Sequence, residues 1–387
     1  MKKVLLIITG FIFILQSCAD KTFVLTEEEK LNLPAEPYAY NSLSLPTGSS
    51  PASNNFNDFE ILNGAPIFVE NKTDITRWGA TLGRVLFYDK KLSLNNTVSC
   101  GSCHHQDKAF ADGKQFSTGF EGRVTTRNSM AIVNPVLQNN LFWDSRSKTI
   151  HDLSLQPIQN HIEMGMENLD RLVEKLNNTT YYKPLFVKAF GSEEINPENI
   201  SKAISQFVAS ITSSRSRFDE GQKNNFSNFS ELEKLGRDLF HGEKAKCSSC
   251  HGGGNLSALD GPNDPYGGGG SLSTQDLRGA TNIGLDLVYK DNGLGNGKFK
   301  IPSLRNIDIT GPYMHDGRFN TLEEVVDHYT NGIKPHNDLD IKFTDGKGHV
   351  KPLNLTSLEK KAIVAFLKTL TDTEMTKDPK WSNPFKS

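Results

Sequence analysis

Apolar residues recur at helical spacing in two parts of the chain, and the same sequence blocks appear in both parts. The first such stretch has its apolar residues at Ile75, Trp78, Leu82, Val85 and Leu86. Its block Leu-Gly-Arg-x-Leu-Phe, Leu82–Phe87, returns at Leu235–Phe240. A second block, Ala-Ile-x-x-Phe with an apolar residue four positions further on, occurs at Ala203–Ile211 and at Ala362–Leu370. Because strand signals are sparse, the pattern predicts an all-α chain built as two similar halves.

The N-terminal region differs in composition from the two halves. Residues 1–17 begin with Met-Lys-Lys and continue with an apolar run too short to span a bilayer, which is typical of a secretion signal. The run ends in Leu-Gln-Ser-Cys, which resembles a lipoprotein lipobox, so we expect Cys18 to carry a lipid; an ordinary signal peptide is the alternative. Residues 18–55, rich in Pro, Ser and Asn, are expected to form a lipidated, flexible tether. The polar segment 218–230 predicts a boundary between domains of residues 56–222 and 223–387.

Composition and charge narrow the function classes. The formal net charge of -2 gives neither the basic stripe of a nucleic-acid-binding protein nor the acidic excess of a disordered one. A hydrophobic content of 36%, with 32 Gly and 17 Pro, indicates a soluble protein rich in loops. The glycine run at 267–270 is not a phosphate-binding loop, because no strand precedes it and no Lys-Ser/Thr follows it.

Four cysteines form two Cys-x-x-Cys-His motifs, and these carry the strongest chemical signal. A catalytic dithiol would need a βαβ context, which is not visible, and a zinc site would need four ligands, whereas the two pairs lie about 150 residues apart. Cys-x-x-Cys-His is also the attachment sequence for c-type haem, with both thiols on the vinyl groups and the histidine on the iron. We therefore predict two covalent haems, with His105 taking no part. The haem-binding residues are Cys100, Cys103, His104, Cys247, Cys250 and His251.

Each half thus has a helix, a haem anchor, loops and a second helix, the order found in class I cytochrome c. The predicted fold is all-α, with two cytochrome c-like domains each wrapped round one covalently attached haem. The chain resembles the bacterial dihaem cytochrome c peroxidases and the related MauG-type enzymes of methylamine utilisation, in a lipoprotein form. The resemblance spans Ile75 to Leu370 and rests on ordered motifs: "LGRVLFYD", "SCGSCHH", "AFADG", "RNSMAIVN", "FWDSR", "PIQNHIEMG" and "PSLRNIDITGPYMHDGRFNTLEEVVDHY".

The resemblance implies roles for three residues near the first haem. Trp143 matches the tryptophan that lies between the haems and helps electrons pass. Glu163 matches the carboxylate above the N-terminal haem, which would move a proton between the two oxygens of peroxide. Pro157 matches a proline that lines the same pocket. Outside the resemblance, Trp143 would be interpreted as a core residue and Glu163 as a solvated one.

The second haem has two candidate axial ligands. His315 lies where the family has a histidine close to this haem, and Met314 beside it is one candidate. Fourteen residues after His315, the peroxidases have a ligand methionine and the MauG-type enzymes a tyrosine; here the residue is Tyr329. A phenolate ligand should stabilise ferric iron and lower its potential. We expect Tyr329 to ligate, with Met314 or an open position as alternatives, and His328 to be a surface or core residue.

The resemblance also implies a calcium ion between the domains. Its protein ligands would be the Asn128 side chain and the backbone carbonyls of Thr310 and Pro312. Amide and carbonyl oxygens suit a hard cation, and water would complete the coordination.

Two positions depart from the family pattern. Leu153 stands where many members have a glutamine that assists the distal glutamate, so the pocket is more apolar and full peroxidase turnover is in question. Phe120 stands where many peroxidases have a histidine that blocks the N-terminal haem at rest. A phenyl ring does not ligate iron, so we predict a five-coordinate haem that needs no reductive activation. His151 and His161 are the possible substitutes for that histidine.

Three functions remain open at this point. The first is a peroxidase that reduces hydrogen peroxide to water at the N-terminal haem. Its electrons would come through the C-terminal haem from a small periplasmic monohaem cytochrome or cupredoxin. The second is MauG-like, peroxide-dependent oxidation of a partner protein, and the third is a non-catalytic dihaem electron carrier. In each case we expect an exported, periplasmic, lipid-anchored protein that does not bind nucleic acid. The resemblance also implies that a homodimer is possible, since family members often form one, but the sequence itself does not indicate the oligomeric state.

Overall fold

The computed structural model describes residues 31–47, 49, 59–62, 65–68, 75–138, 140–252, 254–257 and 280–386. The expected leader, Cys18 and the glycine run at 267–270 lie outside these residues. Over the described ranges, helices make up most of the regular secondary structure, as the sequence pattern predicts. None of the helices in these ranges has the length and apolarity that crossing a membrane requires.

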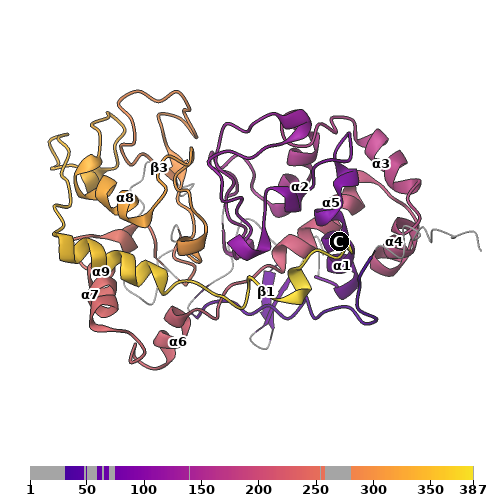
Figure 1. The fold of residues 1–387 in the computed structure, drawn as a ribbon, viewed down its shortest axis with the longest axis horizontal. Coiled ribbons are helices and arrows are strands. Elements are labelled where there is room, and N and C mark those ends of the chain that lie inside the picture. The colour runs from indigo at the N-terminus through magenta and orange to yellow at the C-terminus, as the bar shows by residue number, and fades with distance from the viewer. Residues whose placement is uncertain are drawn as a thin grey trace, which may run out of the picture.

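Helices and short strands follow one another in two lobes, coloured purple to rose and rose to yellow in Figure 1. The first lobe contains β1 (Phe59–Leu62), β2 (Ala65–Phe68), α1 (Arg77–Tyr88), α2 (Ile150–Gln159), α3 (Leu169–Asn177), α4 (Tyr182–Phe190) and α5 (Pro197–Ala209). The second contains α6 (Arg217–Lys223), α7 (Glu231–His241), β3 (Ala280–Thr281), β4 (Phe299–Lys300), α8 (Leu322–Asp327), the π-helical turn η9 (His328–Gly332) and α9 (Ser357–Lys368). Both strand pairs are antiparallel, with Phe59 opposite Phe68 and Ala280 opposite Lys300.

The sequence repeat corresponds to one helix crossing that occurs in each lobe. In α1, Gly83 lies so close to α5 that a Cβ atom would collide with the carbonyl oxygen of Ala203. In α7, Gly236 meets the carbonyl oxygen of Ala362 in α9 in the same way. The glycine of each Leu-Gly-Arg block therefore allows close contact with the helix of the Ala-Ile-x-x-Phe block. The structure confirms the predicted repeat.

Each lobe has its own apolar core, built around this helix pair. In the first, Phe87 and Phe207 pack with ring centroids 5.2 Å apart, and both are almost fully buried. In the second, Phe240 and Phe366 pack at 5.1 Å and are also buried. The cavities described below lie beside these two cores, so the repeated helices fix the walls of both.

The two ends of the described chain lie together on the first lobe. After α9, the last residues cross back to the vicinity of α1 (Figure 1), where Trp381 is buried and Leu31 pairs with Phe385. The Arg84 side chain donates to the carbonyl oxygen of Ser382 at 2.6 Å. We call residues 375–386 the C-terminal strap. The expectation of a C-terminal domain running to residue 387 does not hold for this strap, because its partners belong to the first lobe.

Part of the expected tether is also packed rather than flexible. Tyr40 is 1% exposed, contacts the Phe207 ring at 6.3 Å and donates to the carbonyl oxygen of Lys380 at 2.8 Å. Its aromatic ring fills space between α5 and the strap, a contact that the local composition of residues 18–55 does not indicate. The boundary between the lobes also lies slightly earlier in the sequence than expected. Phe218 in α6 already packs on Phe366 of the second lobe, with ring centroids 5.8 Å apart.

Candidate functional site: two cavities joined by a tryptophan

The first Cys-x-x-Cys-His motif forms a tight turn on the wall of a large cavity. The 3-10 turn η3 (Cys100–Ser102) begins at Ser99, whose backbone N–H donates to the Ser102 hydroxyl at 3.0 Å. This turn brings Cys100, Cys103 and His104 to a cavity of about 960 Å³. The Nδ1 atom of His104 donates to the carbonyl oxygen of Phe110 at 2.7 Å, which leaves Nε2 available as a ligand.

These residues fit a covalently held haem better than a zinc ion or a disulfide. The described cysteines are all free thiols, and burial raises the pKa of Cys100 to about 12 and that of Cys103 to about 11. Within the described ranges, His, Cys, Asp and Glu side chains do not cluster in threes as a metal site built from protein alone requires. The cavity is mostly apolar, which suits a porphyrin.

Glu163 lies on the wall of the same cavity, in a turn that follows α2. The Asn160 side-chain oxygen accepts from the backbone N–H groups of Ile162 at 2.8 Å and Glu163 at 3.3 Å, and so shapes this turn. Burial raises the pKa of the Glu163 carboxyl, and the nearby positive charge of Arg146 only partly offsets that rise. A half-buried carboxyl of this kind can hold a proton and release it. Pro157 and Leu153 line the same cavity, so the structure brings these sequence-predicted residues together.

A loop that precedes α2 in the sequence, at Gly119 and Phe120, holds the Glu163 turn in place through backbone contacts. The N–H of Phe120 donates to the carbonyl oxygens of Ile162 at 2.8 Å and Glu163 at 2.9 Å. Gly119 is packed so closely that a Cβ atom there would collide with the Ile162 carbonyl oxygen. Phe120 itself is buried beside the cavity and does not line it.

Neither of the alternative histidines reaches this cavity. His151 faces Glu198, with Nε2 at 3.4 Å from the carboxylate, and His161 is exposed. Of the described residues lining the cavity, His104 is the only histidine. Glu163 therefore shares this cavity with His104, and no other imidazole of the described residues lines it.

Charged residues at the edge of the first cavity join the two lobes, and sequence analysis did not single them out. Arg127 donates to Asp144 at 2.6 Å and, through two nitrogens, to Asp291 of the second lobe at 2.6 and 2.8 Å. Arg146 pairs with Asp144 at 2.9 Å. The Asp-x-Arg of "FWDSR" is the one sequence feature that indicates this charged cluster. Asp291, which pairs with Arg127, lies far away in sequence and has no such local signal.

The second Cys-x-x-Cys-His motif repeats this arrangement in the other lobe. Cys247, Cys250 and His251 line a cavity, and the Nδ1 atom of His251 donates to the Pro302 carbonyl oxygen at 3.2 Å. The free volume between the walls is smaller here, about 220 Å³. Burial lowers the pKa of His251 to about 4, so its imidazole is neutral, as a metal ligand must be.

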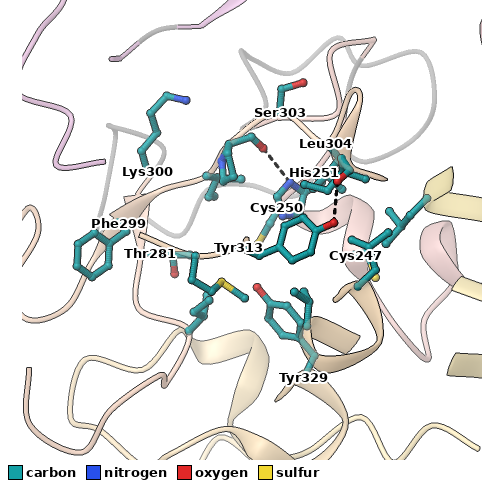
Figure 2. Close-up of a pocket in the computed structure, with 18 of the residues that line it drawn as sticks. Cys247, Cys250, His251, Thr281, Phe299, Lys300, Ser303, Leu304, Tyr313 and Tyr329 are labelled. Carbon is teal, nitrogen blue, oxygen red and sulfur yellow. Dashed lines mark hydrogen bonds between the residues drawn. The ribbon is translucent and has the colours of Figure 1, made fainter. Parts of the chain in front are cut away.

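Both axial candidates line the second cavity. Figure 2 shows the hydroxyl of Tyr329, on η9, directed into the space that His251 also faces. Burial raises the pKa of Tyr329 well above its ordinary value, so without a metal the phenol is neutral. Met314 lines the same cavity, and its backbone φ of 74° is left-handed. The geometry therefore brings both residues to the site without selecting one.

The histidines of this lobe have different surroundings. His315 is 4% exposed and stacks on Phe299, with centroids 3.6 Å apart. His328 is buried, and its Nε2 bonds to the Ile283 carbonyl oxygen at 3.0 Å, which makes it the core residue expected from its position.

Trp143 and Asn128 line both cavities, so they lie between them. The carbonyl oxygen of Trp143 accepts from the N–H of Lys300 at 2.8 Å, and the Asn128 N–H donates to the His315 carbonyl oxygen at 2.7 Å. Hydrogen bonds from the second lobe thus hold both residues.

The three expected calcium ligands also face one cavity. Asn128, Thr310 and Pro312 line the second cavity together. The Asn128 Nδ2 donates to the Lys114 carbonyl oxygen at 2.9 Å. This hydrogen bond fixes the orientation of the amide and leaves Oδ1 as the atom that can coordinate a cation.

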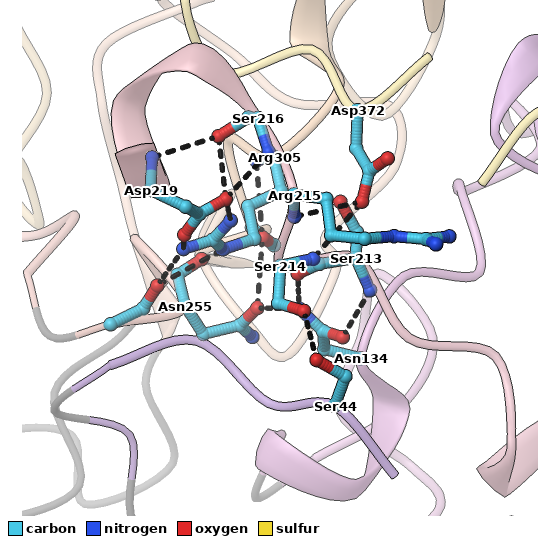
Figure 3. A network of polar contacts seen from close by, with 12 residues as sticks. Ser44, Asn134, Ser213, Ser214, Arg215, Ser216, Asp219, Asn255, Arg305 and Asp372 are labelled. Atoms are coloured by element: carbon cyan, nitrogen blue, oxygen red, sulfur yellow. Dashed lines mark hydrogen bonds and ion pairs between the residues drawn. The ribbon is translucent and has the colours of Figure 1, made fainter. Parts of the chain in front are cut away.

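A buried ion pair fixes the loop after the second anchor (Figure 3). Arg305 and Asp219 are 1% and 2% exposed and pair at 2.8 Å, and Arg305 also donates to the Gly254 carbonyl oxygen at 2.7 Å. Nearby, the side-chain amide of Asn134 in the first lobe donates to the carbonyl oxygen of Ser213 and accepts from its backbone N–H. This network sets the position of the second motif relative to the first lobe.

Comparison with known proteins places this arrangement among dihaem enzymes. Residues 78–226 match the profile of a family described as di-haem cytochrome c peroxidase. The chain is 30% identical over 292 residues to the methylamine utilization protein MauG of Methylophilus methylotrophus, covering 75% of this chain and 82% of that protein. It is 33% identical over 297 residues to cytochrome c551 peroxidase of Nitrosomonas europaea, covering 76% and 79% of the two chains.

Solved structures give the same result. A MauG-like protein associated with microbial copper homeostasis matches with a TM-score of 0.70 and 34% identity, over 84% of this chain and 98% of that one. The diheme peroxidase BthA from Burkholderia thailandensis matches with a TM-score of 0.61 and 20% identity, over 89% and 100%, which is a likeness of fold.

Proposed function

Because the chain belongs to the family of di-haem cytochrome c peroxidases and MauG proteins, we propose that it reduces hydrogen peroxide to water in the first cavity, with electrons entering through the second. Its family is one of peroxidase-type oxidoreductases that carry two haem c groups. The observation that carries the proposal is the pairing of Glu163 with a cavity whose only described histidine is His104.

The residues of the first cavity would divide the work as follows. Cys100, Cys103 and His104 would hold a haem, which supplies the redox centre that splits the O–O bond. The Glu163 carboxylate would take a proton from one oxygen of peroxide and return it to the oxygen that leaves as water. Leu153 and Pro157 keep the pocket apolar, so the transferred proton is not lost to bulk solvent.

Electrons would reach this cavity from the second one. Cys247, Cys250 and His251 would hold the second haem, with Tyr329 or Met314 as its other axial group. The indole of Trp143, which lines both cavities, is the aromatic group between the two sites. A small monohaem cytochrome or cupredoxin is the donor that this arrangement suits.

MauG-like oxidation of a partner protein is the second candidate function. Tyr329, rather than a methionine, is the residue that η9 brings to the second cavity, and two of the relatives are named MauG. A phenolate ligand would stabilise an oxidised second site, which would then hold the oxidising equivalents taken from peroxide until a partner protein supplies electrons. The third candidate, a carrier without catalysis, would need two six-coordinate haems, and the described lining of the first cavity provides no second imidazole.

We propose further features on sequence grounds. Export, a lipid on Cys18 and a periplasmic location follow from the first eighteen residues, which lie outside the described ranges. A calcium ion held by Asn128, Thr310 and Pro312 would join the lobes, and a homodimer is the expected assembly.

The resting spectrum and steady-state turnover together test the proposal. A ferric protein with one high-spin haem that responds to peroxide, and that consumes peroxide with a reduced small cytochrome, supports the peroxidase. A high-spin haem without turnover supports the MauG-like function, whereas two low-spin haems that ignore peroxide contradict both.

A further inference from the structure

The loop between Leu285 and Phe299 exposes two adjacent large apolar side chains. Leu287 is 62% exposed and Val288 is 83% exposed. Single exposed apolar residues are common on protein surfaces, so exposure alone does not mark a site. Leu287 and Val288 are of interest because their loop also forms part of the wall of the second cavity.

Aromatic contacts connect this loop to the second cavity. Leu285, two residues before the exposed pair, lines the cavity, as do Phe299 and His315. Tyr289, directly after the pair, packs against Phe299 at 6.5 Å, and Phe299 stacks on His315 at 3.6 Å. The exposed pair is therefore the outer surface of a wall whose inner surface faces the proposed second haem.

The loop is held firmly, so its exposed surface is preformed. Asp286 pairs with Arg318 at 2.6 Å, and Asp291 pairs with Arg127 of the first lobe at 2.6 Å. The Tyr289 hydroxyl donates to the Asn282 side-chain oxygen at 2.9 Å and accepts from the Leu285 N–H at 2.9 Å. Because Asp286 and Asp291 are the only acidic residues of the loop, both of its negative charges are neutralised internally.

Three lysines lie on this loop or on a segment that contacts it. Lys290, two residues after the pair, is exposed, and Lys298 comes after Gly297, which lies against the Tyr289 ring. Lys334 is exposed, and its N–H donates to the Gly284 carbonyl oxygen at 2.7 Å. None of the three forms an ion pair with a described residue, whereas Asp338, the acid on the neighbouring segment, faces His336 at 3.9 Å.

We propose that Leu287 and Val288, together with Lys290, Lys298 and Lys334, form the docking surface for a small redox protein whose own apolar patch is surrounded by acidic groups. This inference rests on the proposed function and specifies the donor's surface chemistry. Each donor molecule is oxidised by one electron, and two electrons with two protons reduce one peroxide to two waters. Apolar contact gives a short transfer distance, and opposite charges raise the association rate at low salt.

The test compares two protein donors of opposite charge. Reduced plastocyanin, an acidic cupredoxin, and reduced mitochondrial cytochrome c, which is basic, are each supplied to the holoenzyme with peroxide at several salt concentrations. The variants are Val288→Asp and the double variant Lys298→Glu/Lys334→Glu. Leu358→Glu is the matched control, because Leu358 is 59% exposed in the first turn of α9, away from the loop. A small organic reductant measures peroxide turnover independently of docking.

We expect the wild type to prefer plastocyanin, with kcat/KM falling as salt increases. The double lysine variant should lower that kcat/KM by about tenfold or more at low salt and flatten its salt dependence, and Val288→Asp should lower it severalfold. The control should match the wild type, and all variants should keep the wild-type rate with the small reductant.

A preference for the basic donor, or equal rates for the wild type and both variants, would overturn the docking surface while leaving the peroxidase intact. If the wild type consumes no peroxide with the small reductant, the proposed function fails instead. The surface is then judged by titrating reduced plastocyanin against the same variants, and equal affinities would overturn it.

Discussion

The indole Nε1 of Trp143 donates a hydrogen bond of 2.9 Å to the carbonyl oxygen of Asn128, and both residues line both cavities. The ring is thereby fixed in the wall that separates the two proposed haems. Its position depends on backbone groups of both lobes, so a change in how the lobes pack would also move the tryptophan.

Trp143→Phe should slow peroxide turnover while both haems stay attached. Phenylalanine keeps much of the apolar volume but removes the hydrogen bond to Asn128, at a cost of about 1 kcal/mol in the free energy of unfolding. Stopped-flow reduction of each haem measures transfer between the sites. Trp78→Phe, which changes a tryptophan that contacts Lys188 on the first lobe, is the control and should leave this rate unchanged.

Glu163→Gln should lower the rate of reaction with peroxide by about 10²–10⁴-fold, the usual contribution of a positioned acid or base. The amide has nearly the same shape but does not accept and return a proton. Rapid mixing of the ferric protein with peroxide gives the rate, and the pyridine haemochrome spectrum confirms that two haems remain. An unchanged rate would remove Glu163 from the proton path.

Tyr329→Phe should alter the spectrum of the second haem and raise its reduction potential, because an anionic donor that stabilises ferric iron is lost. Tyr313→Phe is the matched control: Tyr313 lines the same cavity, but its hydroxyl donates to the Ile307 carbonyl oxygen at 2.9 Å. If Met314→Leu changes the spectrum and Tyr329→Phe does not, then Met314 is the axial ligand.

Acid should destabilise the junction between the lobes through Asp219. Burial alone would raise the pKa of this carboxyl, but the charge and hydrogen bonds of Arg305 outweigh it and hold the pKa below the ordinary value of 3.8. A carboxyl whose pKa is lowered on folding stabilises the fold above its unfolded pKa. That contribution disappears as the pH falls through the lower, folded value.

Asp219→Asn should therefore cost about 3–5 kcal/mol at neutral pH, because Arg305 is left buried without its partner, and should weaken the pH dependence of unfolding below pH 4. Far-UV circular dichroism during acid titration measures both effects. Asp238→Asn, which removes the exposed partner of Arg237, should match the wild type.

Sequence could predict the parts of this molecule that depend on local pattern. The Cys-x-x-Cys-His motifs fix which residues face each cavity, and the glycine of Leu-Gly-Arg marks a helix contact that the structure shows at both Gly83 and Gly236. Glu163 and Trp143 were found only through resemblance, because nothing in their neighbours indicates a cavity wall.

Contacts between distant segments could not be predicted in this way. The Arg127–Asp291 pair joins residues 164 positions apart, and Tyr40 is buried by residues near the other end of the chain. The polar, proline-rich composition of residues 18–55 predicts a flexible segment, but the burial of one aromatic residue, Tyr40, fixes part of it against the first lobe.

The C-terminal strap makes completion of the first lobe depend on a segment that follows the second lobe in the sequence. The Gln106 side chain, two residues after His104, donates to the carbonyl oxygens of Met375 at 3.1 Å and Asp378 at 2.8 Å. Those acceptors follow α9 in the sequence, so the first anchoring turn stays uncovered until the segment beyond α9 has folded back onto the first lobe. Closure of the first lobe over its anchoring turn is therefore completed only when the chain has returned from the second lobe.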